Sequence, residues 1–445
     1  MQSMIQRGIA VGWIGAAMVA LLCQHAPGVV LEKLLISSGA LDAAVFAQPV
    51  KGEYDYRKAV EAKPRDPEAL YDYALFLHEK KDSDGAERMY KRAIEADPKH
   101  ADALFTYGDL LRSARGDYDG AELYYKRAID AAPKHVRALG SYALLLATVR
   151  KNYPEAERFY KRAIAADPRF VKTLTNYANL LKTQWHEYEE AEILYKQALA
   201  VDPKYSRALN NYADLLADAG KDFDGAEKLW KRAIAADPAY SSPLMGYAKM
   251  LAAQRSDFKT AAIYYKRAIA IDPKLTAAHV SLAALYEKTG APDEQVTAHY
   301  LAAIKSDQTA VEPHIRYAQF LFRRRLVPDG LIMLDRATSL LSTESSGAAQ
   351  LECWFCIFCF RSEPARGAAL GRLKRLVVTE KTRSRDWDFS GVVAQAVGDN
   401  HPESAWLAKL AAVIGDKAKP ETLSEWKTWN NPEPEAAVAP PPPVK

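Results

Sequence analysis

The sequence AELYYKRAIDAAPKH, residues 121–135, is one copy of a motif that returns along the chain every 35 residues. Close copies begin at Ala86, Ala156, Ala191, Ala226 and Ala261, and a weaker copy, VTAHYLAAIKSDQTA, begins at Val296. A fixed period of this length is typical of a solenoid, in which similar units stack along one direction. We therefore expect function on a long repeated surface and not in a single enclosed pocket.

A second pattern recurs between these copies at the same period. It contains a tyrosine followed by a small residue, such as Tyr107 and Gly108, and then a leucine pair. Apolar residues three and four apart predict a helix, and Ala121 and Tyr125 mark a second helix after a short polar turn. A proline, Pro133 in this copy, ends the second helix. Each unit is thus expected to be a helix hairpin whose apolar face only a neighbouring hairpin can bury.

The combined motif resembles the tetratricopeptide repeat family over residues 51–340. The residues that carry the resemblance are Leu104, Tyr107, Gly108, Leu111, Ala121, Tyr125, Ala128 and Pro133. The resemblance implies an all-α, right-handed superhelical α-solenoid of about eight hairpin repeats, with a peptide-binding concave groove lined by the first helix of each unit. Most units carry one extra residue in the turn between their helices. The eighth is degenerate, with Gly330 and Leu334 in place of alanine and tyrosine, and a fragment at Tyr54 is expected to cap the stack.

The charged residues inside the repeat have predominantly structural interpretations. Glutamates four residues before lysines, as in Glu87–Lys91 and Glu122–Lys126, predict pairs that stabilise an exposed helix face by about 0.2–0.5 kcal/mol each. Asp119 and Asp224 lie in turns that lack the remaining ligands of a calcium loop. We expect these two aspartates to cap the second helices.

Seven polar residues of the expected groove are candidates for holding a partner segment: Arg137, Lys172, Asn176, Asn179, Arg207, Asn210 and Asn211. The three cations fall at one repeat position in successive units, and two of the asparagines share another. Asparagine can bond both the N–H and the C=O of an extended backbone, and the cations could hold acidic side chains or a terminal carboxylate. The alternative is that the asparagines pack against adjacent turns and the cations stay solvated.

Some members of this family hold chaperone C-termini with a two-carboxylate clamp. That clamp needs a lysine at one position of a first helix. The position holds Tyr71, Phe105, Gly140, Thr175, Asn210, Met245, Val280 and Ile315 in this chain. Binding of chaperone tails is therefore not supported.

Composition bounds the function further. A net charge of +4 on 445 residues gives no electrostatic case for nucleic acid, which usually needs a basic stripe. The sequence has no Gly-rich phosphate loop, no Gly-x-Ser-x-Gly elbow and no His-Glu-x-x-His. We expect a non-enzymatic scaffold or adaptor that binds protein or peptide segments, acidic ones among them, without a cofactor.

The chain departs from the repeat at both ends. Residues 1–47 contain an apolar stretch, GIAVGWIGAAMVALLC, which suggests a targeting signal or membrane anchor. Residues 350–430 are expected to form a helical cap, with tryptophans 387, 406, 426 and 429 available to fill it. Residues 431–445 form a proline-rich tail that cannot pack a core.

Two other functions remain open. The first is a membrane-tethered assembly or trafficking factor, which would be membrane-associated, exported or organelle-targeted through residues 1–47 and otherwise cytoplasmic. The second is a metal- or cluster-bearing redox protein, because Cys353, Cys356 and Cys359 lie three apart. No fourth ligand is evident, and thiols among Trp354, Phe355 and their neighbours suit a buried helix as well.

Overall fold

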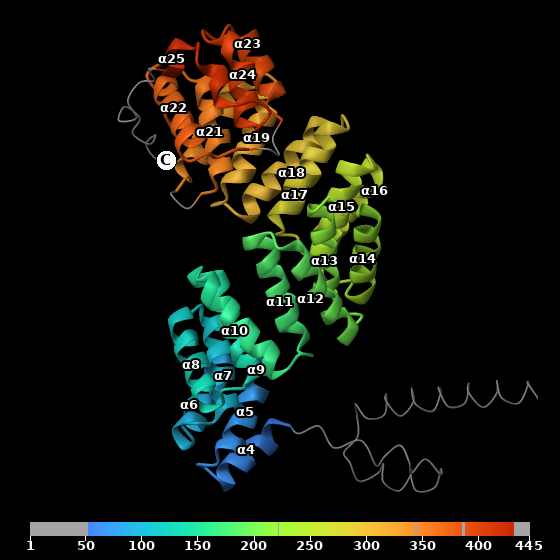
Figure 1. Ribbon diagram of the computed structural model, residues 1–445, viewed down its shortest axis with the longest axis vertical. Helices are drawn as coiled ribbons and strands as arrows, with labels where there is room; N and C mark the ends of the chain where they lie inside the picture. The colour runs from blue at the N-terminus through green and yellow to red at the C-terminus, as the bar shows by residue number, and fades with distance from the viewer. Residues whose placement is uncertain (1–51, 221, 343–344, 385–387, 431–445) are drawn as a thin grey trace, which may run out of the picture. The chain divides into compact units, whose positions relative to one another are not determined.

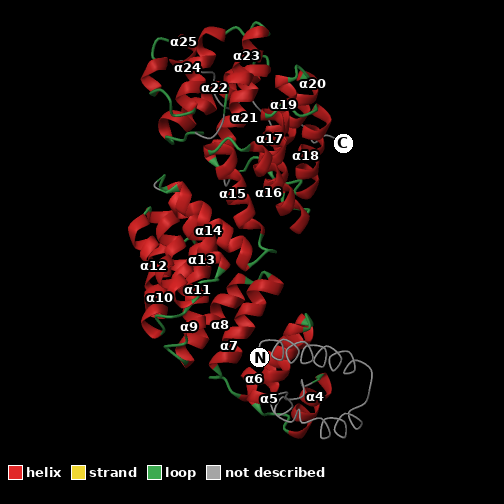
Figure 2. Cartoon of the chain, turned by 90° about the vertical axis from the view of Figure 1, so that its right-hand side faces the viewer, coloured by secondary structure: helices red, strands yellow, loops and turns green. Residues whose placement is uncertain are grey.

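The computed structural model describes residues 52–220, 222–342, 345–384 and 388–430. The expected leader, the proline-rich tail and Trp387 lie outside them. Throughout the described residues the regular structure is helical, with no strand (Figure 2), which confirms the all-α class. The chain divides into two compact units, one ending at Ala166 and the other beginning at Asp167.

The first unit consists of a single helix and three hairpins, which can be followed from α4 to α10 in Figure 1. Its helices are α4 (Glu53–Ala62), α5 (Pro67–Glu79), α6 (Ser83–Ala96), α7 (Ala101–Leu110), α8 (Tyr118–Ala131), α9 (Val136–Leu145) and α10 (Tyr153–Ala166). Small residues let the two helices of a hairpin approach closely. A Cβ on Gly108 of α7 would lie 3.0 Å from the Tyr125 ring of α8. Tyr125, Ala121 and Ala128 are fully buried, as the repeat pattern predicts.

The second unit continues with five hairpins. Its repeat helices are α11 (Val171–Leu180), α12 (Tyr188–Val201), α13 (Ser206–Asp218), α14 (Phe223–Ala236), α15 (Ser241–Gln254), α16 (Phe258–Ile271), α17 (Thr276–Lys288), α18 (Asp293–Ser306), α19 (Val311–Arg323) and α20 (Val327–Ser339). Consecutive hairpins bury the same tyrosine or tryptophan register, for example Tyr195, Trp230 and Tyr300. The two units together contain the eight hairpins expected from the sequence.

The extra residue of the 35-residue repeat has a definite place in three hairpins. It is absorbed in a π-helical turn at the end of the first helix, and these turns span Leu111–Arg115, Leu146–Arg150 and Leu181–Trp185. One inserted residue converts α-helical bonding into a π turn locally. Each turn ends on a left-handed residue, and the next backbone N–H bonds the first π residue, as from Asp117 N to Leu111 O at 3.0 Å. The extra residue thus lengthens the first helix.

Glutamates of the second helices join neighbouring hairpins, a role that the sequence interpretation missed. Glu87 Oε1 accepts a hydrogen bond from Tyr107 Oη of the next hairpin at 3.3 Å, in addition to the ion pair with Lys91 at 2.8 Å. Arg115 of the next hairpin lies 3.1 Å from Glu87 Oε2. Tyrosine hydroxyls donate equivalent bonds across three other junctions: Tyr142 to Glu122, Tyr212 to Glu192 and Tyr247 to Glu227. These carboxylates therefore stabilise stacking as well as their own helix face.

The helix caps differ from the expectation by two residues. Asp117 and Asp222, not Asp119 and Asp224, accept the capping bonds, from Gly120 N and Gly225 N at 2.8 Å each. The reason is that each helix begins at the following aromatic residue, which leaves the earlier aspartate at the N-cap. The later aspartates instead pair with arginines of the next hairpin, Asp119 with Arg150 in the first such pair and Asp224 with Arg255 in the second.

A helical C-terminal region follows the last hairpin. Its elements are α21 (Gly347–Phe360), α22 (Ala365–Lys374), a π turn (Arg375–Thr379), α23 (Ser390–Gly398), α24 (Ser404–Ile414), a 3-10 turn (Pro420–Leu423) and α25 (Lys427–Asn430). The first of these helices is buried over most of its length, and Phe360 at its end stacks on Phe322 of α19 with ring centroids 4.0 Å apart. Trp426 lies between Trp406 and Trp429 in a parallel stack. Among the described helices, none is long and apolar enough to span a bilayer.

Candidate functional site

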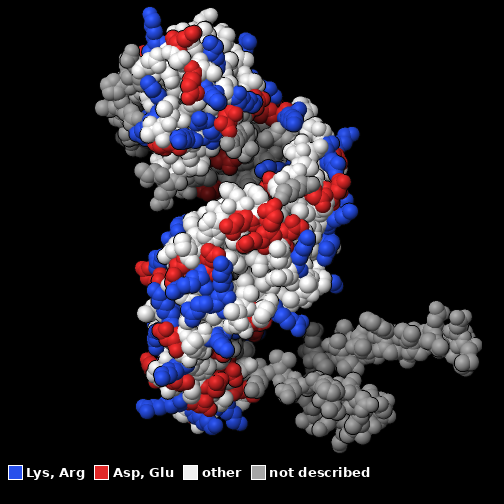
Figure 3. Space-filling model, viewed as in Figure 1, with Lys and Arg blue, Asp and Glu red and all other residues white. Residues whose placement is uncertain are grey.

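Six of the seven predicted groove residues lie on two adjacent first helices of the second unit. Lys172, Asn176 and Asn179 are on α11, and Arg207, Asn210 and Asn211 are on α13. The seventh, Arg137, holds the corresponding position on α9 of the first unit. Lysines and arginines share the face drawn in Figure 3 with acidic residues, and neither sign covers it.

Arg137 is exposed but already engaged within its own unit. Its guanidinium lies over the Phe105 ring, 4.5 Å from the centroid, and 4.0 Å from Asp102 Oδ1. A cation over an aromatic ring contributes about 0.5–1 kcal/mol at an exposed site. Arg137 therefore stabilises the junction of its hairpin with the preceding one.

The equivalent cations of the second unit are uncommitted. Lys172 and Arg207 are exposed, and within the described residues neither has an ion-pair partner. Asn179 is exposed and Asn176 half-buried, one helical turn apart on α11. Cationic donors and amide groups, which can both donate and accept, thus lie along α11 and at the start of α13.

Asn210 does not have the exposed position that a direct ligand contact requires. It is 4 % exposed, and its Nδ2 donates to Asn211 Oδ1 at 3.3 Å and to Asp214 Oδ2 at 3.0 Å. Its carbonyl Oδ1 is buried and has no hydrogen-bond partner in the described part of the chain. The physical reason for its burial is the register, because Phe105, Thr175 and Ile315 at the same position are also buried. Asn210 therefore bonds Asn211 and Asp214 from within the helix packing.

Asp214 is a site residue that sequence reasoning missed. It lies on α13, one turn after Asn210, and its Oδ1 accepts a hydrogen bond from Trp230 Nε1 at 3.0 Å. Burial raises the pKa of the Asp214 carboxyl, an effect that Lys182 and the Trp230 bond offset only in part. A visible signal was Trp230 itself, since it replaces the tyrosine of the other copies and a buried indole N–H needs an acceptor.

A cavity of about 330 Å³ opens in front of Asp214. Its wall includes Trp230, Ala217 and Met250, and charged groups border it at Lys182, Asp218 and Lys249. Lys182 is only 11 % exposed, and its Nζ lies 2.9 Å from Asp218 Oδ2. Gly246 makes room on α15, because a Cβ there would lie 2.7 Å from Trp230 Nε1. An apolar wall with a carboxylate at its base is typical of a ligand subsite.

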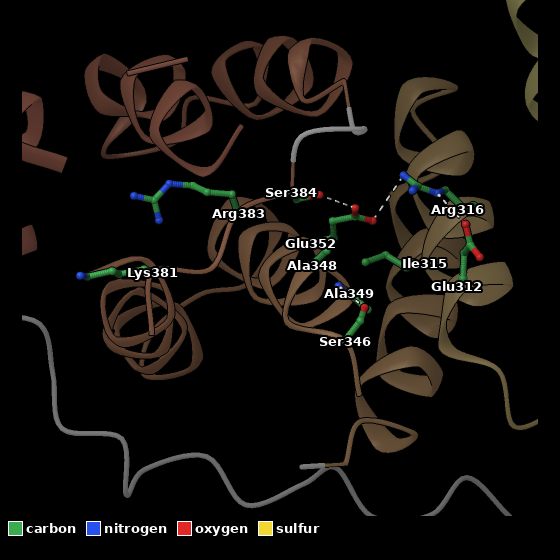
Figure 4. Close-up of a pocket in the computed structure, with 10 residues that line it drawn as sticks. All are labelled: Glu312, Ile315, Arg316, Ser346, Ala348, Ala349, Glu352, Lys381, Arg383 and Ser384. Carbon is green, nitrogen blue, oxygen red and sulfur yellow. Dashed lines mark hydrogen bonds and ion pairs between the residues drawn. The ribbon is translucent and has the colours of Figure 1, made fainter. Parts of the chain in front are cut away.

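A second cavity, of about 590 Å³, lies between α19 and the first turns of α21 (Figure 4). Glu352 is 5 % exposed and accepts a hydrogen bond from Ser384 Oγ at 2.7 Å, and Arg316 lies 3.3 Å from its other oxygen. Lys381 and Arg383 extend away from Glu352 in this view. Glu352 is therefore paired with Arg316, and Arg383 Nε lies 3.5 Å from Asp416 Oδ1, so the cavity makes a weaker case for a ligand than that at Asp214.

The three cysteines do not form a ligand set. Cys353, Cys356 and Cys359 are buried on α21, and burial raises the pKa of all three thiols. A metal ligand must be the thiolate, which this environment disfavours. In the described residues, moreover, no three His, Cys, Asp or Glu side chains are grouped to hold a metal ion. The residues present thus do not fit a zinc or iron–sulfur site: Cys356 and Cys359 pack in the C-terminal core, and Cys353 packs with Ile315 and Ala337.

Among solved structures, this chain is similar to several tetratricopeptide repeat proteins. A tetratricopeptide repeat protein from Parabacteroides merdae is 18% identical, with a TM-score of 0.45 over 60% of this chain and 98% of that one. YrrB, described as having an unusual peptide-binding site, is 19% identical, with a TM-score of 0.34 over 43% and 97%. Pseudomonas aeruginosa pilF is 20% identical, with a TM-score of 0.41 over 48% and 94%. At this level of similarity their partners say nothing about the partner of this chain.

No curated protein matches the sequence significantly. The tetratricopeptide repeat family model matches residues 53–101, 80–135, 110–169, 186–241 and 217–276. These matches cover α4 to α10 and α12 to α16, and α11 lies in the gap between them. The helices pair in sequence order and bury the alanine and tyrosine registers of the motif. The repeats within residues 53–169 and 186–276 therefore belong to the tetratricopeptide repeat family.

Proposed function

We propose that the chain is a non-enzymatic adaptor that binds an extended protein segment along the first helices α11 and α13. The coarse part of this function, a scaffold for protein interaction, follows from the repeat family. The finer part rests on one observation. Lys172 and Arg207 stand exposed and unpaired at one register of adjacent hairpins, while most outer-face lysines of the repeat already have a carboxylate four residues away.

The polar groups of α11 suit an extended backbone. Asn176 and Asn179 each offer an N–H₂ donor and a carbonyl acceptor, so together they can bond both edges of a peptide unit. Lys172 and Arg207 can hold acidic side chains or a terminal carboxylate of the same segment. Asn211 shares the register of Asn176 on the next hairpin.

The proposal is tested with peptides selected from a random displayed library on the immobilised full chain. Synthetic copies of the selected peptides are titrated by fluorescence polarisation against a Lys172→Ala, Asn176→Ala double variant. Because charge-assisted hydrogen bonds contribute about 1.5–3 kcal/mol each, we expect affinity to fall more than about tenfold with helicity intact.

The matched control changes two lysines of the outer helices, Lys126→Ala and Lys161→Ala. These lysines pair with Glu122 and Glu157 and are 51 % and 63 % exposed, so their contribution is small. Equal losses in the two double variants would show that the α11–α13 face is not the site. The tryptophan-rich C-terminal region would then be the better candidate.

A further inference from the structure

Two aspartates hold the same repeat register but meet different surroundings. Asp109 on α7 and Asp214 on α13 lie three repeats apart. Each accepts a bond from the aromatic residue of its hairpin: Asp109 from Tyr125 Oη at 3.2 Å, and Asp214 from Trp230 Nε1 at 3.0 Å. The repeat thus offers an internal comparison of two carboxylates at one register, one before the π turn of α7 and one within the α-helix α13.

The two aspartates differ in whether a cation one turn later pairs with them. Arg112, one turn after Asp109, donates to Asp109 Oδ1 from Nη2 at 2.7 Å and from Nε at 3.2 Å. The residue at the register of Arg112 in the hairpin of Asp214 is Ala217. Ala217 lines the cavity in front of Asp214. The place that a guanidinium fills in the second hairpin is therefore open cavity in the fifth.

The groups around Asp214 compensate its charge only in part. Lys182 bonds Asp218, so these two charges offset each other, and Lys249 at the rim is exposed to water, which screens it. Each oxygen of Asp214 accepts one neutral hydrogen bond, and an ionised carboxylate has room for about four. Next to it, the buried Oδ1 of Asn210 also lacks a donor. Asp214 therefore has room for further donors, in a cavity that Lys182, Asp218 and Lys249 also line.

We propose that this cavity is a subsite for an arginine or lysine side chain of the bound protein segment, whose cationic group pairs with Asp214 where Arg112 pairs with Asp109. The inference rests on the proposed function, since the guest belongs to the segment bound along α11 and α13. The stem of the guest packs against Trp230 and Met250, and its head adds the donors that Asp214 lacks. A cationic head also reverses the effect of burial on the carboxylate.

The subsite also indicates which charges the partner segment carries. Arg207 and Asp214 are seven residues apart on α13, about 10 Å along the helix axis at 1.5 Å per residue. The start of α13 thus favours an acidic group and the Asp214 cavity a basic one. We infer that the segment carries both, separated by a comparable distance.

The test uses the peptides selected on the full chain. We expect them to carry arginine or lysine at one fixed position. Replacing that residue by citrulline, which keeps the shape of arginine without its charge, should weaken binding at least about tenfold. Asp214→Asn should cause a similar loss, and citrulline should then cost nothing further. Asp109→Asn, the matched control in the first unit, should leave the affinity unchanged.

Ala217→Arg supplies the second readout. By analogy with Arg112, the new guanidinium should fill the cavity, raise the melting temperature and lower peptide affinity. If that variant does not fold, the Asp214→Asn and citrulline cycle decides alone. Unchanged peptide affinity in Asp214→Asn would overturn the subsite. A loss of stability in that variant at neutral pH would also overturn it, because Lys182 would then already neutralise Asp214. If no peptide binds, or if changing Lys172 and Asn176 has no effect, the proposed function fails and the subsite with it.

Discussion

The stacking of hairpins should depend measurably on Glu87, which joins α6 to α7. Its Oε1 accepts from Tyr107 Oη at 3.3 Å, its Oε2 pairs with Arg115 at 3.1 Å, and Lys91 lies 2.8 Å from Oε1. The Tyr107 bond contributes about 1 kcal/mol, because Tyr107 is buried and would lose its acceptor. The two ion pairs are partly exposed and contribute about 0–1 kcal/mol each. Glu87→Ala should therefore lower the free energy of unfolding of the first unit by about 2 kcal/mol.

A comparison of Glu87→Ala with Glu87→Gln separates the components. Glutamine keeps an acceptor for Tyr107 but has no charge, so it should lose only the ion-pair part, about 1 kcal/mol. The control is Glu95→Ala on the same helix, because Glu95 is exposed. Denaturant unfolding, with hydrogen exchange read over α6 and α7, locates the change in a repeat protein whose units need not unfold together.

The pH dependence of the free energy of unfolding gives an independent test of the Glu87 ion pairs. The hydrogen bond from Lys91 is the largest cause that holds the pKa of Glu87 below its usual value, with burial opposing it. A carboxyl with a lowered folded pKa stabilises the protein above its unfolded pKa of about 4.3, and the effect disappears as pH falls through the folded value. The ion-pair part of the deficit of Glu87→Ala should therefore be complete at pH 7 and vanish in acid. A deficit no larger than that of Glu95→Ala, or one independent of pH, would refute this role of Glu87.

Three further outcomes follow from individual contacts. Gly246→Ala should cost about 1–3 kcal/mol and shift tryptophan fluorescence, because its Cβ would lie 2.7 Å from Trp230 Nε1; unchanged spectra and stability would contradict that packing. His299 has a pKa lowered by burial, and its Nδ1 lies 3.1 Å from that of His279. Stability should therefore fall as pH drops below about 6.5, and His299→Gln should reduce this fall when the melting temperature is measured against pH. The Cys356 thiol, whose pKa burial raises, should resist alkylation in the folded chain and react after denaturation, as mass spectrometry would show; rapid labelling of the native protein would place α21 outside the core.

The repeat period sufficed to predict the hairpins because each unit is local. The small-residue register and the tyrosine register place two helices against each other within one unit, so the pattern alone predicts eight pairs. The position of the extra residue was harder. Whether an insertion lengthens a turn or forms a π turn depends on how the first helix packs at its end, as at Leu111, which stays buried in the π turn. Side-chain packing of this kind is not visible in a single unit's sequence.

Two expectations about individual residues depended on contacts that the sequence does not show. Glu87 pairs with Lys91 on its own helix as expected, and Tyr107 and Arg115 also reach it from the next hairpin. Asn210 was expected among the groove residues, yet it is buried, as are Phe105 and Ile315 at its register. The residues at this register are largely apolar, and that pattern is a sequence signal for a buried position.

The Asp214 subsite shows why such a comparison carries functional information in a repeat protein. Equivalent registers give residues similar surroundings, even though Arg112 lies in a π turn and Ala217 in an α-helix, so a carboxylate that one hairpin neutralises internally is expected to need neutralisation in another. Arg112 neutralises Asp109, whereas Ala217 at the same register provides no cation for Asp214. A partly buried carboxylate without its cation lowers stability, and repeat arrays tolerate that cost because neighbouring interfaces add stability independently. One arginine-to-alanine difference between registers is thus enough to turn a structural ion pair into half of a binding site, with the other half left to the partner.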